Sequence, residues 1–83
     1  IEQRQQRPVQ TAGAWMQLGR AEMNLQNPEE ADRCFAEAWA QAERIGHRAM
    51  LAHIGFRWGE LAFAQGRHAL ALERLETARR AYE

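Results

Sequence analysis

Apolar residues return along this chain every three or four positions, the spacing that places them on one face of an amphipathic α-helix. Four helices are predicted, from about Pro8 to Leu25, from Pro28 to Ile45, from His47 or Arg48 to Gly66, and from Arg67 to Tyr82. The chain is rich in Ala, Gln and Leu and poor in β-branched residues, so an all-α fold is expected. The stripes predicted to face the core are Trp15, Leu18 and Leu25, then Ala31, Cys34, Phe35, Ala38, Ala42 and Ile45, then Leu51, Ile54, Trp58 and Leu61, and finally Ala71, Leu75, Ala78 and Tyr82.

Residues that favour helix ends stand between these segments. Asn27 can cap the second helix, Pro28 suits its first turn, and Glu30 stands where a capping-box acid reaches back. Gly46 permits the left-handed residue that commonly follows a last helical turn. Gly66 interrupts the third apolar pattern in the same way. The second and third helices are therefore expected to end at these two glycines.

The chain also repeats itself with a shift of forty residues. Residues 18–22 align with 58–62, and three apolar positions of the second helix align with three of the fourth. Self-similarity at this period is typical of helical repeat proteins, in which each hairpin buries its apolar face by stacking on a neighbour. The predicted organisation is a polar flank over 1–7, a first hairpin over 8–46 and a second hairpin over 47–83.

The repeated residues resemble the tetratricopeptide repeat family. The matching positions are Trp15-x-x-Leu18-Gly19 followed by Ala31, Phe35 and Ala38, and Trp58-Gly59-Glu60-Leu61 followed by Ala71, Leu75 and Ala78. The resemblance implies two stacked antiparallel helical hairpins, an α-solenoid fragment that binds a protein or peptide. A period of forty exceeds the usual thirty-four or so. Such long repeats are similar to those of bacterial multidomain regulators, so the segment is expected to be a sensor or scaffold of a regulatory or signalling protein.

The same resemblance implies a partner-binding groove on the first helix of each hairpin. Apolar side chains at several of these positions lie off the predicted core stripes and favour an adaptable hydrophobic surface. The other interpretation is that these side chains simply pack against neighbouring helices. The predicted groove residues are Met16, Arg20, Met23, Asn24, His53, Phe56, Arg57, Glu60 and Phe63.

Self-association is a second expectation. Solenoids generally need about three repeats for independent stability, whereas two are visible here. Leu70, Leu72 and Leu75 give the fourth helix more apolar surface than one hairpin should cover. Either further repeats follow in a longer protein, or two copies associate through this helix. The alternative function is accordingly a dimerisation or structural spacer domain with no external ligand.

Composition narrows the choice of partners and compartment. Eleven basic residues balance eleven acidic ones, so no net field draws the chain toward nucleic acid or an anionic membrane. No apolar run is long enough to span a bilayer, and the single cysteine cannot form a disulfide within the chain. A cytoplasmic protein with a protein partner is expected.

Candidates for chemistry are few. Cys34 falls on the apolar face of the second helix, where a thiol is usually a buried hydrophobe with a raised pKa. His47, His53 and His68 do not share a helix at i, i+4, and no neighbouring Cys or His supplies metal-ligand spacing. The sequence therefore predicts a protein that is no enzyme and holds no metal or cofactor.

Overall fold

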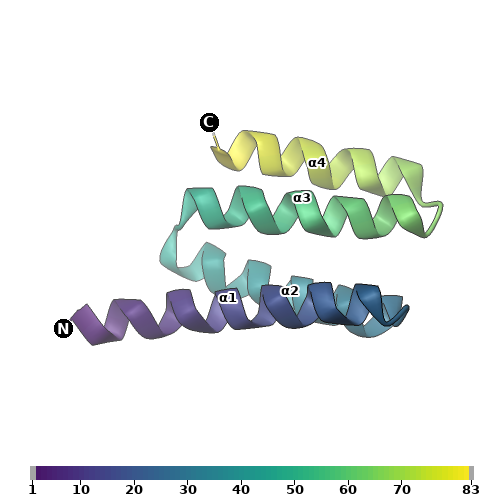
Figure 1. The fold of residues 1–83 in the computed structure, drawn as a ribbon. Helices are drawn as coiled ribbons and strands as arrows, with labels where there is room; N and C mark the ends of the chain where they lie inside the picture. The colour runs from purple at the N-terminus through teal and green to yellow at the C-terminus, as the bar shows by residue number, and fades with distance from the viewer. Residues whose placement is uncertain (1, 83) are drawn as a thin grey trace.

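Four helices joined by short turns make up residues 2–82, the part of the chain that this computed structural model describes (Figure 1). The helices are α1 (Glu2–Asn24), α2 (Pro28–Ile45), α3 (Arg48–Ala64) and α4 (His68–Tyr82). Between residues 2 and 82 there is no strand, which confirms the all-α prediction. No helix in this range combines the length and apolarity that crossing a lipid bilayer requires.

The helices form two hairpins that pack on each other. α1 lies along α2, and α3 lies along α4, each pair antiparallel, with both hairpin turns at the right-hand end of Figure 1. α3 also packs against α2 and touches α1, so it is the helix that joins the second hairpin to the first. The observed arrangement agrees with the predicted pair of helical hairpins.

Three helices end in the same way, with one residue of positive φ. These residues are Gln26 (61°), Gly46 (67°) and Gly66 (80°). After α3, the Gly66 amide donates to the Phe63 carbonyl and the following amide donates to the Ala62 carbonyl, which is the Schellman pattern. The same bonds recur after α1 and α2. The predicted roles of the two glycines are confirmed, and Gln26 takes the equivalent position between α1 and α2 although it is not a glycine.

The helix starts differ from prediction in two places. α1 begins at Glu2 and continues through Pro8, because the Gln, Arg and Glu residues around that proline are strong helix formers. Asn27 makes no side-chain cap on α2; its Nδ2 donates instead to Glu22 Oε2 at 3.1 Å. A side-chain cap is present instead at the start of α3, where His47 Nδ1 accepts a hydrogen bond from the Met50 amide at 3.1 Å.

The core lies between the two hairpins and contains few large side chains. Phe35 and Ile54 are the largest fully buried ones among the described residues. Close approach of the helices depends on glycine, because a Cβ at Gly19 would lie 3.0 Å from the Phe35 ring and one at Gly59 would lie 3.0 Å from Leu75. The core cluster comprises Ala12, Met16, Ala31, Phe35, Ala38, Ala42, Ile54 and Leu61.

Some predicted core positions are wrong. Leu18 and Leu25 of α1 are 47% and 67% exposed, and Tyr82 of α4 is 71% exposed. Met16, which the sequence assigned to a groove, is instead buried in the core. The reason is that helical periodicity shows which residues share a face, whereas the placement of α2 and α3 decides which face of α1 is covered.

Candidate protein-interaction surface

A polar contact closes the junction between the two hairpins. Trp58 Nε1 donates to Asp32 Oδ1 at 2.7 Å, and Arg74 Nη1 donates to the same oxygen at 3.2 Å. The Arg74 guanidinium also lies 3.8 Å from the centre of the Trp58 ring, within cation–π range. One carboxylate of α2 thus holds both α3 and α4. Sequence reasoning missed this junction because its members are far apart in the chain and follow no local spacing.

Replacing Asp32 with Ala is expected to lower the free energy of unfolding by about 1–2 kcal/mol, because two hydrogen bonds to a half-exposed charge are lost. Urea unfolding followed by circular dichroism measures this change. Glu37→Ala is the matched control, since Glu37 is an exposed acid of the same helix and its loss should change stability by no more than about 0.5 kcal/mol. Equal midpoints for the two variants would contradict the role assigned to Asp32.

The second hairpin presents an exposed apolar surface on the side away from the first hairpin. We call it the α3–α4 face and define it by Phe56, Phe63, Leu75 and Tyr82, which line its depressions, and by Leu72, which lies one helical turn before Leu75. Leu75 is half-buried at its centre, whereas the other four are 52–71% exposed. Two shallow depressions meet at Phe56 and Leu75. One is lined by Ala52, Phe56, Leu75, Ala78, Arg79 and Tyr82, and the other by Phe56, Gly59, Glu60, Phe63, Ala64 and Leu75.

The first hairpin has the equivalent surface, and there it is covered. A shift of forty residues maps the first depression onto Ala12, Met16, Phe35, Ala38, Trp39 and Ala42. All of these belong to the core cluster or pack against it, together with Ile54 and Leu61 of α3. The first hairpin therefore seats a helix on this surface, while among residues 2–82 the second hairpin carries none.

The predicted groove residues do not form one groove. Met16 is in the core and Met23 is half-buried against it, so neither side chain lies on an open groove. Phe56, Glu60 and Phe63 are brought together on the α3–α4 face. Arg57 pairs with Glu60 at 3.0 Å. The three remaining side chains are exposed and line neither depression: Arg20, Asn24 and His53.

The predicted self-association leucines are also divided. Leu75 and the exposed Leu72 belong to the α3–α4 face, but Leu70 lines a different hollow beside Trp39, Trp58 and Arg74. The reason is geometric, since Leu70 and Leu72 are two positions apart and therefore point about 200° apart around the helix. Of the three leucines, only Leu72 and Leu75 can contribute to contacts at the α3–α4 face.

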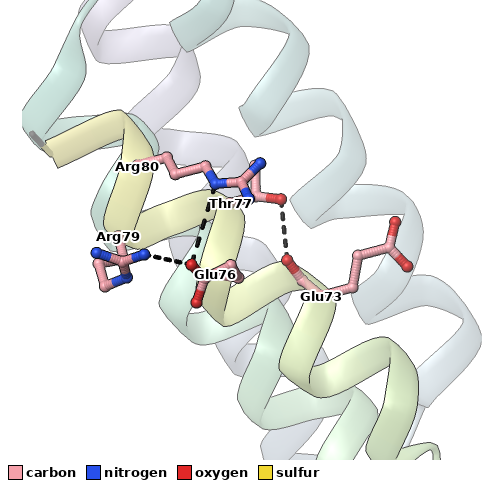
Figure 2. Close-up of polar contacts among 5 residues, drawn as sticks. All are labelled: Glu73, Glu76, Thr77, Arg79 and Arg80. Carbon is pink, nitrogen blue, oxygen red and sulfur yellow. Dashed lines mark hydrogen bonds and ion pairs between the residues drawn. The ribbon is translucent and has the colours of Figure 1, made fainter.

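Charged side chains border this face at the end of α4. Figure 2 shows Arg79 hydrogen-bonded to Glu76, with Arg80 Nε 4.0 Å from the same carboxylate and the Thr77 hydroxyl donating to the Glu73 carbonyl. The hydrogen bond from Arg79, followed by its charge and that of Arg80, lowers the pKa of Glu76. The two arginines stand in the last helical turn, where positive charge is favourable.

The cysteine and histidines considered for catalysis or metal binding have structural roles or lie far from one another. Cys34 is buried, and burial followed by the charges of Glu30 and Glu22 raises the pKa of its thiol, which disfavours the nucleophilic thiolate. His47 caps α3, and the His68 ring lies 4.9 Å from that of Phe63. Over the described part of the chain, no three His, Cys, Asp or Glu side chains gather closely enough to hold a metal ion.

The α3–α4 face therefore has features of a protein-binding surface. It combines exposed aromatic and aliphatic side chains with a charged rim, as the buried centre and polar edge of protein interfaces do. Comparison of the chain with family models, with curated proteins and with solved structures finds no match.

Proposed function

We propose that this chain is a protein-interaction module of the tetratricopeptide type, which binds a helix of a partner protein on its α3–α4 face. In this proposal it serves as the sensor or scaffold segment of a bacterial regulatory or signalling protein in the cytoplasm. The observation that carries the proposal is the repeat equivalence. The depression beside Phe56 and Leu75 matches, residue by residue, the surface on which the first hairpin seats α3.

The chemistry of the face supports a helix as the occupant. Exposed apolar patches of this kind mark interaction sites in soluble proteins. An amphipathic helix binds such a surface through side chains at i, i+3, i+7 and so on. On the first hairpin, α3 uses this spacing with Leu51, Ile54, Trp58 and Leu61.

A peptide with the sequence of residues 47–65, carrying Trp58→Leu, is a direct probe of the face. The substitution matches the peptide to Leu72, which stands where the first hairpin has Asp32, the partner of Trp58. We expect saturable binding of the fluorescently labelled peptide by anisotropy, and about tenfold weaker binding to the Phe56→Glu variant. The thermal midpoint of that variant should stay close to wild type because Phe56 is half exposed.

His53→Glu is the matched control, because His53 is an exposed residue of the same helix that lines neither depression. It should bind the peptide as the wild-type chain does. If the wild-type chain shows no saturable binding, or if Phe56→Glu binds equally well, the proposed function fails. The alternative of a spacer domain without an external ligand would then be favoured.

A further inference from the structure

We infer that the helix which occupies the α3–α4 face is α1 of a second copy of this chain, so that copies stack head to tail. This inference rests on the proposed function, because it names the occupant of the same surface. It starts from the forty-residue repeat, which relates α1 to α3 as well as the two receiving surfaces to each other.

The outer side of α1 is equivalent to the side of α3 that packs on the first hairpin. The α3 residues in or against the core cluster are Met50, Leu51, Ile54, Trp58 and Leu61. Subtracting forty gives the polar Gln10 for Met50 and, for the other four, a set of exposed residues of α1. We call this set the α1 outer face: Thr11, Ala14, Leu18 and Ala21. Leu18 lies at the centre of the α1 outer face, is 47% exposed, and is equivalent to Trp58. The described chain therefore carries one open receiving surface and one open helix side in matching register.

The polarity of the two surfaces also matches. Inside the chain, Trp58 needs the Asp32 carboxylate because its indole N–H must be satisfied at a half-buried site. In the stack, Leu18 takes the position of Trp58 and Leu72 takes that of Asp32. Cys34 stands at the repeat position of Arg74. The three residues of the polar junction inside the chain thus correspond to Leu72, Leu18 and Cys34 between copies, none of which carries a charge.

The sizes of the side chains are compensated across the same junction. On the receiving surface, Phe56, Phe63 and Tyr82 are larger than their counterparts Met16, Met23 and Ala42, whereas the central Leu75 is smaller than Phe35. On the inserted helix, Ala14 and Ala21 are smaller than Ile54 and Leu61. Cores tolerate exchanges that conserve total volume far better than one-sided changes. The larger receiving surface is therefore suited to the smaller α1 outer face.

One exchange runs in the opposite direction and places a cation beside an aromatic ring. Gly55 of α3 lies against the Trp39 ring, to which a Cβ at that position would be 3.2 Å away. In the stack, Trp15 replaces Gly55 on the inserted helix, and Arg79 replaces Trp39 on the receiving surface. A Trp is then added on the inserted helix opposite an Arg, and an Arg beside a Trp is a favourable cation–π pair.

α1 and α4 lie at the bottom and the top of Figure 1 and do not pack on each other, so the α1 outer face does not meet the α3–α4 face within one chain. Their contact is therefore heterologous, and such a contact leaves one face of each kind open after every addition. We expect the mass of the 83-residue chain to rise with concentration beyond that of a dimer, as measured by sedimentation.

Two exposed substitutions separate the two faces. Leu18→Glu disables the α1 outer face, and Leu72→Glu disables the α3–α4 face. Each variant alone should remain monomeric where the wild-type chain associates, with self-association weakened about tenfold or more. An equimolar mixture of the two should form a 1:1 complex that grows no further, because each partner contributes its intact face. Circular dichroism establishes that both variants are folded.

Arg20→Glu is the control, since Arg20 is an exposed residue of the same helix that lies about 200° around it from Leu18. It should associate as the wild-type chain does. If Leu18→Glu or Leu72→Glu is not folded, Ala21→Arg and Phe63→Glu form a second pair with the same expected outcome.

Three results would overturn the inference: a wild-type chain that is monomeric at all concentrations, association lost with Leu72→Glu but unchanged with Leu18→Glu, or variants that do not combine in the mixture. The second result would indicate a symmetric dimer through α4. Titration of the 47–65 peptide into Leu18→Glu keeps the two proposals distinguishable. Peptide binding without a mixed complex leaves the proposed function standing and removes only the second copy as occupant.

Discussion

Replacing Phe35 with Ala is expected to lower the free energy of unfolding by about 3–5 kcal/mol, the largest effect of any substitution considered for this chain. Phe35 is fully buried, and its ring fills the space left by Gly19. A Cβ placed on Gly19 would lie 3.0 Å from the ring. It also belongs to the cluster that contains Ile54 and Leu61, so it supports both hairpins at once. Removing the ring leaves a cavity that the surrounding helices can close only in part.

A domain of this length is typically stable by only about 4–12 kcal/mol. The Phe35→Ala chain should therefore lose much of its helical circular dichroism or unfold at a far lower urea concentration. Phe63→Ala is the control, because Phe63 is 64% exposed and its loss should cost no more than about 0.5 kcal/mol. Both variants must be compared at a protein concentration where the chain is monomeric. Similar urea midpoints for the two would show that Phe35 is not the centre of the core.

Gly55→Ala is expected to destabilise the chain by about 1–3 kcal/mol, although Ala is the better helix former. The new Cβ would lie 2.8 Å from Ala78 Cβ and 3.3 Å from Ala78 Cα, so α4 would have to move away from α3. The backbone of α4 cannot yield as a flexible side chain could. Steric overlap therefore outweighs the gain of about 1 kcal/mol in helix propensity.

Gly13→Ala is the matched control for this second prediction. Gly13 is also a helical glycine, but a Cβ there would have no neighbour within 4 Å, so the substitution should stabilise the chain by about 0.5–1 kcal/mol. If α3 and α4 approach each other as described, the thermal midpoint should fall for Gly55→Ala and rise for Gly13→Ala. Adding Ala78→Gly to Gly55→Ala should recover part of the loss, and a purely additive result would contradict the assigned contact.

Local chemistry accounts for the parts of the structure that the sequence predicted well. The ends of α2 and α3 follow from Gly46 and Gly66, because a residue that adopts positive φ without strain satisfies the last carbonyl groups of a helix. Hairpin pairing follows from the forty-residue repeat. The start of α1 was not predictable in the same way, because a proline suits a first turn but does not exclude helix before it.

The candidate surface could be predicted only in part. Phe56 and Phe63 were identified because they lie off the core stripe of α3, and the structure places both on one exposed face. Met16 was identified by the same argument and is buried. The two cases are alike in sequence but differ in their neighbours, since α3 covers one of them and no helix among residues 2–82 covers the other.

The sequence by itself determined that this chain is helical, where its helices end, and that its two halves are versions of one hairpin. These features depend on backbone propensity, glycine conformation and periodicity, which act between residues close in the chain. Only the tertiary structure decided which apolar side chains are buried, which of them form the open α3–α4 face, and that Asp32 joins Trp58 to Arg74. Those outcomes depend on how the second hairpin sits on the first, because burial is a property of the neighbours of a side chain and not of the side chain alone.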